Sequence, residues 1–213
     1  MPFLHVTTRI EGVKHDGLLS EKGGRGFPTL MFLDAEGSIL AQQEDRAVTG
    51  FETTLENVKT YLDLKTRQAK GEKGLELPLF MAELKLGLMS YQDAKSKAET
   101  FQKLSEAEKA QIAEALFDLE VRQLMDAFNP RSEEGKAAAA KLVEYAQAGK
   151  QPSPALRLNY WGLLSYIATE VNKDPDLLEK CLTNLRALPE SKDFEEQLQQ
   201  MEQKLQEMRK GEP

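Results

Sequence analysis

The segment GRGFPTLMFLD, residues 24–34, decides how the N-terminal part of the chain is interpreted. Two glycines precede a Phe-Pro-Thr step, and a short apolar run follows it. Cis peptide bonds in proteins are almost confined to bonds that precede proline, so Pro28 is the residue that could make one here. The apolar run, residues 30–33, has the length and composition of a β-strand. We therefore expect a strand to begin directly after a proline turn.

The residues on either side of this segment predict further elements. Residues 3–8 are rich in Phe, Val and Thr and indicate a strand, and residues 16–22 indicate a short helix that the following glycines end. Residues 34–37, Asp-Ala-Glu-Gly, have the composition of a hairpin turn, and residues 38–41 are the expected partner strand.

A helix is expected after the hairpin. Thr49 and Glu52 have the spacing of a capping box, in which the two side chains satisfy free backbone N–H groups at a helix start. Apolar residues then recur at helical spacing, which predicts that one face of the helix packs on the hairpin. These residues are Phe51, Leu55, Val58 and Leu62.

The order strand, helix, Phe-Pro-Thr step, hairpin, helix resembles the second half of a thioredoxin-like domain, over roughly residues 3–65. In that family the proline is cis and lies beside the redox cysteines, and its neighbours offer their backbone to an extended substrate. The resemblance implies that Phe27, Pro28 and Thr29 bind substrate by strand addition. The Cys-x-x-Cys motif that belongs to the first half of such a domain is absent from this sequence.

Three interpretations of the missing half follow. The sequence could be a fragment or have a misplaced start, another chain could supply the missing elements, or the half-domain could have become a small three-stranded remnant. An unpaired strand edge promotes aggregation, which disfavours the remnant unless something covers it. A glutathione-transferase-like arrangement is disfavoured because residues 49–52 stand where that family has a Glu-Ser pair.

The organisation expected is therefore an α+β, partial thioredoxin-like domain over residues 1–66, a linker over residues 67–77 and an all-α domain over residues 78–210. The linker is polar and contains glycine, and no strand pattern recurs after it. Seven helices with short loops are predicted in the all-α domain, with N-caps at Ser90, Ser105, Ser132, Asp174 and Ser191 and with Gly87 ending the first of them. Their hairpins resemble tetratricopeptide repeats, with a plain helical bundle as the alternative.

Composition limits the classes of function. The 213 residues carry a net charge of −7, which disfavours nucleic-acid binding. No run approaches the ~20 apolar residues of a membrane helix. The single cysteine, Cys181, cannot form an internal disulfide, and its apolar spacing predicts a buried, inert thiol. His5 and His15 lack ligand spacing, so we expect neither a metal nor another cofactor.

The sequence thus predicts the C-terminal part of a chain of the thiol–disulfide oxidoreductase type, inactive in redox chemistry in the form given. The alternative is a non-catalytic interaction module that works through the helical domain. Either function implies a protein or peptide partner, or completion by another chain. A cytoplasmic location is expected if Met1 is the true start, and a periplasmic location is open otherwise.

Tyr160 and Trp161 are the candidate residues for a partner groove in the helical domain. Because they are adjacent on a predicted helix, we expect that they cannot both face fully inward. The more exposed of the two would then line a groove, where aromatic side chains act as binding anchors. Packing in the core is the favoured use of these two residues, and the groove is the alternative.

Overall fold

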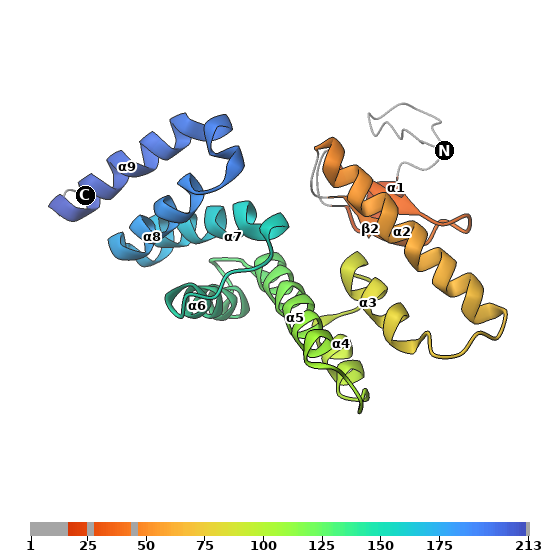
Figure 1. Cartoon of the computed structure of the whole chain (residues 1–213). Helices are drawn as coiled ribbons and strands as arrows, with labels where there is room; N and C mark the ends of the chain where they lie inside the picture. Colours follow the sequence, from red (N-terminus) through yellow and green to blue (C-terminus); the bar gives the residue numbers. More distant parts are fainter. Residues whose placement is uncertain (1–16, 25–27, 44–46, 212–213) are drawn as a thin grey trace, which may run out of the picture. The chain divides into compact units, whose positions relative to one another are not determined.

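The computed structural model describes residues 17–24, 28–43 and 47–211 (Figure 1). The predicted strand over residues 3–8 lies outside these ranges, and so does Phe27. In the described residues the chain is helical apart from one two-stranded sheet. Its contacts divide it into two compact units, Met1–Leu88 and Met89–Pro213.

The sheet in the first unit is an antiparallel hairpin of β1 (Met31–Leu33) and β2 (Ile39–Gln42). Phe32 lies opposite Ala41, and the register shifts immediately after this pair. The predicted hairpin is confirmed, with each strand displaced by one residue from its predicted start.

The turn of the hairpin is held by the side chain that the sequence indicated. Asp34 Oδ1 accepts hydrogen bonds from the backbone N–H groups of Glu36, at 3.0 Å, and Ser38, at 2.7 Å. Gly37 has a φ of +81°, a conformation that side chains disfavour. Local turn chemistry therefore fixes where β1 ends and β2 begins.

Helix α1 (Leu18–Glu21) is one turn long and precedes the Pro28 step. Gly23 follows it with a φ of +73°, a conformation that glycine adopts more readily than other residues. Gly24 lies so close to the helix that a Cβ there would be 2.3 Å from Leu19 Cδ1. These two glycines allow the chain to turn sharply from α1 toward β1.

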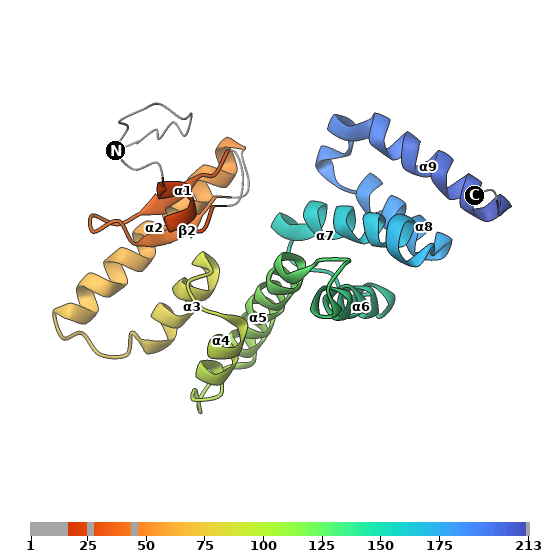
Figure 2. The same ribbon diagram turned by 180° about the vertical axis from the view of Figure 1, so that it is seen from behind.

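Helix α2 (Val48–Ala69) crosses one face of the hairpin, as the opposite views in Figures 1 and 2 show. Its N-cap is Ala47, which has no capping side chain, so the predicted capping box at Thr49 and Glu52 is wrong. The helix begins one residue before Thr49, and this places both side chains inside the first turns.

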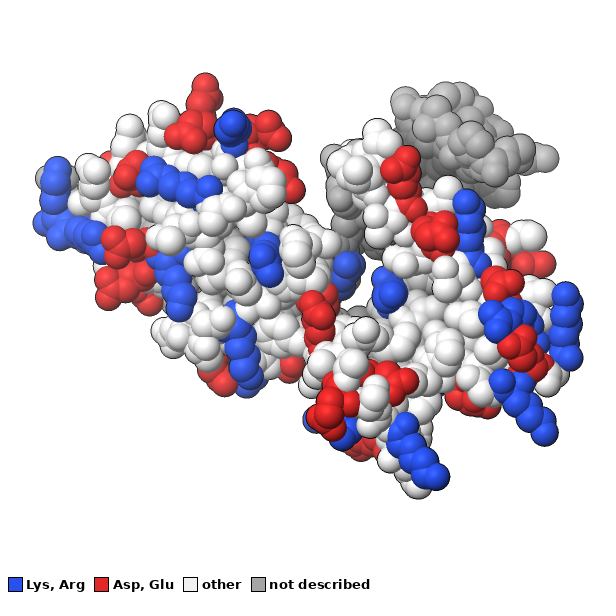
Figure 3. All heavy atoms as spheres, in the orientation of Figure 1, with Lys and Arg blue, Asp and Glu red and all other residues white. Residues whose placement is uncertain are grey.

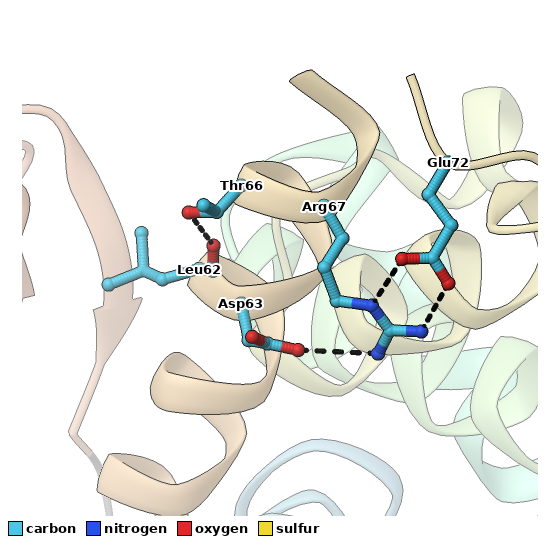
Figure 4. A network of polar contacts seen from close by, with 5 residues as sticks. All are labelled: Leu62, Asp63, Thr66, Arg67 and Glu72. Carbon is cyan, nitrogen blue, oxygen red and sulfur yellow. Dashed lines mark hydrogen bonds and ion pairs between the residues drawn. The ribbon is translucent and has the colours of Figure 1, made fainter. Parts of the chain in front are cut away.

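Helix α3 (Glu76–Leu86) packs against α2 and ends at Gly87, which has a φ of +66°. The chain between the two helices is held by Arg67, whose guanidinium binds both carboxylate oxygens of Glu72 and also Asp63 (Figure 4). These bonds lower the pKa of the Glu72 carboxyl, with the side-chain hydrogen bond from Arg67 as the main cause.

The core of the first unit consists of two small clusters that share contact with Tyr61. One joins the hairpin to α2 and α3, and the other joins α2 to the start of α3: Leu40, Ala41, Val58 and Leu86, and Leu64, Leu75, Leu79 and Ala82. Because Leu75 is buried here, α3 belongs to the first unit. The unit therefore ends at Leu88, later than the linker predicted over residues 67–77.

The predicted apolar face of α2 is only partly buried. Val58 lies in the core, but Phe51, Leu55 and Leu62 are exposed, and Val48 is exposed with them. The prediction that all of the helical-spaced residues pack on the hairpin is therefore wrong. The hairpin and α3 cover only the side of α2 that carries Gly50, Val58 and Leu64.

The second unit is built from helices that follow one another through short loops. In Figures 1 and 2, α8 lies between α7 and α9, and it packs against both. In chain order the elements are α4 (Tyr91–Ala98), α5 (Glu106–Ala127), α6 (Glu133–Gln147), α7 (Pro154–Tyr166), the π-helix η1 (Ile167–Asn172), α8 (Pro175–Arg186), the 3₁₀-helix η2 (Pro189–Phe194) and α9 (Glu195–Lys210).

Four predicted N-caps in this unit are confirmed: the side chains of Ser90, Ser105, Ser132 and Asp174 each accept a backbone hydrogen bond from the first turn of a helix. The predicted cap at Ser191 is wrong, because that residue lies in η2 and α9 begins only at Glu195. Side-chain hydrogen bonds thus set four of the six α-helix starts described in this unit, with α7 and α9 as the exceptions.

Two glycines provide a matched test of this packing. A Cβ at Gly135 would lie 2.1 Å from the carbonyl oxygen of Asn129, so Gly135→Ala should lower the free energy of unfolding by about 1–3 kcal/mol. A Cβ at Gly162, in the exposed interior of α7, would meet nothing within 4 Å. Gly162→Ala should therefore raise that energy by about 0.5–1 kcal/mol.

Urea denaturation of the two variants measures both shifts. The same sign of shift in both variants would contradict the packing described at Asn129 or the open space beside Gly162.

Candidate functional site

The residues predicted to bind substrate, Phe27, Pro28 and Thr29, come directly before β1 in the sequence. Pro28 is exposed and Thr29 is half-buried, while Phe27 lies outside the described residues. The isomer of the bond between Phe27 and Pro28 therefore stays a prediction. In the structure, Pro28 and Thr29 lie just before the start of β1 at Met31.

The edge of β1 that faces away from β2 is open in the part of the chain that the structure describes, where β1 pairs with β2 alone. Leu30 O accepts a hydrogen bond from Gln43 N at 2.8 Å, and Asp34 N donates to Ser38 O at 3.0 Å. Backbone groups alternate along a strand, so those of Met31 and Leu33 point to the opposite edge. These two residues can pair with another extended chain.

Tyr160 and Trp161 are both buried, with exposed fractions of 0% and 2%. The expectation that one of them lines a partner groove is therefore wrong. Helix α7 contacts α5, α6 and α8, so its buried arc is wide enough for two adjacent side chains. The two rings pack edge to face with centroids 5.0 Å apart, and Tyr160 Oη lies 3.3 Å from the carbonyl oxygen of Leu142.

Cys181 is buried in the core of the second unit, as predicted. Burial, with a smaller effect from Asp174, raises the pKa of its thiol to about 12. A thiol with so high a pKa is neutral at ordinary pH, and the thiolate is the reactive form. The one cysteine of the chain therefore has no environment suited to disulfide exchange.

The second unit also contains a cavity that the sequence did not indicate. Its volume is about 390 Å³, and it lies between the end of α5, one side of α6 and the π-helix η1. The lining combines apolar residues with two amides and two exposed charged residues, Lys136 and Glu144, which we call the charged rim residues: Phe128, Pro130, Lys136, Ala139, Ala140, Val143, Glu144, Gln147, Val171 and Asn172. We call this cavity the α6–η1 groove.

Two features distinguish the α6–η1 groove from an ordinary gap between helices. π-helical turns are rare and occur frequently at functional sites. Lys173, which ends η1, has a φ of +53°, the one positive φ among the described non-glycine residues.

The charged rim residues already have partners within their helix: Lys136 Nζ lies 2.7 Å from Glu133, and Glu144 lies 3.0 Å from Lys141.

Charge and metal chemistry offer no competing site in the described residues. No group of three or more His, Cys, Asp or Glu side chains there could hold a metal ion. On the face shown in Figure 3, basic and acidic side chains are interspersed and form no continuous basic area. Across the same residues, no helix combines the length and apolar character needed to cross a membrane.

No family model matches this sequence, and no curated protein and no solved structure matches it significantly.

The raised pKa of Cys181 gives a prediction for thiol reactivity. At pH 8 the native thiol should react with dithiobis(nitrobenzoate) about 1,000-fold more slowly than the urea-unfolded chain, because its thiolate fraction is that much smaller. Because the folded-state pKa lies above the ordinary 9.0, the buried thiol also makes the free energy of unfolding depend on pH. Its contribution is fully present below pH 9 and is lost as the pH rises toward about 12.

Absorbance at 412 nm measures the first effect, and urea denaturation at a series of pH values measures the second. Equal reaction rates in the native and unfolded chains would contradict the buried position of the thiol.

Proposed function

We propose that this chain provides the substrate-binding half of a thioredoxin-like domain and binds extended polypeptide by strand addition. The observation that carries the proposal is the edge of β1 that pairs with no other described strand and that follows directly after the exposed Pro28. In a thiol–disulfide oxidoreductase this half would work together with a Cys-x-x-Cys motif carried elsewhere. In the form given, the chain binds polypeptide without redox catalysis.

The chemistry at the open edge supports this function. An added strand takes its hydrogen bonds from the backbone, so Met31 and Leu33 could bind chains of many sequences. Pro28 has no N–H group and fixes its own φ, so it gives the entrance to β1 a defined direction. The exposed side chains of Leu33 and Ile39 lie opposite each other and offer apolar contact beside the bound chain.

The absence of redox catalysis follows from the chemistry of thiol–disulfide exchange. The reaction needs a thiolate that attacks a disulfide and, for turnover, a second thiol that resolves the mixed disulfide. The sequence has one cysteine, and the structure places it in a core where its pKa is raised.

The open edge is tested by removing one outward donor. Leu33→Pro deletes an N–H group that points away from β2, so we expect it to weaken binding of reduced, carboxymethylated lactalbumin by about tenfold. Leu33→Ala keeps the donor and serves as the matched control. Binding is measured by fluorescence anisotropy of the labelled probe, and circular dichroism verifies that both variants are folded.

Hydrogen exchange gives a second measurement on the unaltered protein, where the bound probe should slow exchange at Met31 and Leu33. Equal binding by Leu33→Pro and the wild type, or unprotected amides at both positions, would refute strand addition at this edge.

The α6–η1 groove supports a second candidate function, a non-catalytic interaction site in the helical unit. Its volume is within the range of small-ligand and side-chain pockets, which is about 300–1,000 Å³. Because the charged rim residues named above are already paired, an uncharged apolar group fits the groove better than an ion does.

The groove is tested by filling it. Ala140 is exposed and lines the groove, so Ala140→Phe should abolish saturable binding of the uncharged dye N-phenyl-1-naphthylamine. Ala137 lies on the same helix, is exposed and does not line the groove, so Ala137→Phe is the matched control. Dye fluorescence is titrated in both variants; loss of dye binding in neither of them would remove the groove as an apolar site.

A further inference from the structure

Helix α2 carries a stripe of four apolar residues that remain exposed among the described residues. The exposed fractions along it are 74% for Val48, 36% for Phe51, 42% for Leu55 and 42% for Leu62. We call these four residues the α2 stripe. The buried side of the same helix already packs on the hairpin and α3, so the α2 stripe is a second apolar face of one helix.

The spacing along the α2 stripe is symmetric about Leu55. Val48 lies seven residues before it and Leu62 seven residues after it, which is about 10.5 Å in each direction along a helix. If a second α2 helix lies antiparallel with its own Leu55 at the same height, the Val48 of each copy meets the Leu62 of the other. Such a contact is isologous, as a twofold axis requires.

The charges beside the α2 stripe have the same symmetry. Glu52 lies three residues before Leu55 and Lys59 four residues after it, about 4.5 and 6 Å along the helix, and both are exposed on the same flank. A twofold axis at Leu55 brings Glu52 of each copy beside Lys59 of the other. Neither side chain has an ion pair or hydrogen-bond partner in the described residues.

We propose that two copies of this chain associate through antiparallel α2 helices, centred on Leu55 and flanked by two Glu52–Lys59 ion pairs. The interface uses side chains of α2 and leaves the backbone edge of β1 unused, so it is independent of strand addition. One pair of helices buries less surface than a permanent dimer does, and the association is therefore concentration-dependent.

The experiment is sedimentation equilibrium of the full chain over a range of concentrations, with charge reversals on α2. Lys59→Glu or Glu52→Lys alone places like charges together at two symmetric positions and should weaken the dimer by about tenfold. The double variant, Glu52→Lys with Lys59→Glu, restores both pairs and should restore the dimer.

Two further variants complete the test. Leu55→Asp places two carboxylates at the twofold axis and should leave a monomer, and circular dichroism verifies that the variant is folded. Lys73→Glu makes the same change in charge outside α2 and should leave the dimer unchanged. A wild-type chain that is monomeric at every concentration, or a double variant that does not recover the dimer, would overturn the proposal.

Discussion

The packing of α2 on the hairpin and α3 is the constraint on which the first unit depends. A two-stranded hairpin is only marginally stable in water, so β1 and β2 persist because α2 covers one of their faces. Val58 and Leu64 lie on the covered side of the helix, one in each of the two core clusters. If that contact were lost, the turn at Asp34 could not hold β1 in place, and the entrance at Pro28 would lose its position.

Local chemistry explains the predictions that succeeded. The Asp34 turn, the Ser105 capping box and the stop at Gly87 each depend on a few neighbouring residues, and a sequence records them directly. Local patterns also misplaced two helix starts, at Thr49 and Ser191, and the remaining failed predictions depended on which surface covers a helix. Tyr160 and Trp161 are both buried because α7 has neighbours on several sides, and no spacing rule within α7 contains that information.

The α6–η1 groove could not be predicted for the same reason. Its lining comes from the end of α5, from α6 and from η1, and the π-helical turn that brings Val171 to the groove has no local sequence signal. The position of Pro28 and Thr29 directly before a strand could be predicted, because a proline before an apolar run is a local pattern. The sequence did not indicate whether another strand pairs with the outer edge of β1, because that depends on the pairing of the whole sheet.

The two open surfaces of the first unit place different demands on a partner. The outer edge of β1, which no other described strand pairs with, offers backbone groups whose hydrogen bonds an extended chain of any sequence can satisfy. The α2 stripe offers side chains, so only a surface with matching apolar positions and charges can cover it. Backbone pairing tolerates many sequences, so polypeptides of different sequence could bind at the β1 edge. Side-chain matching tolerates few, so the α2 stripe suits one partner with a defined surface. A second copy of the chain provides such a surface because Val48, Leu55 and Leu62 are equally spaced. The sequence of the polypeptide that binds at β1 can then vary without effect on this interface.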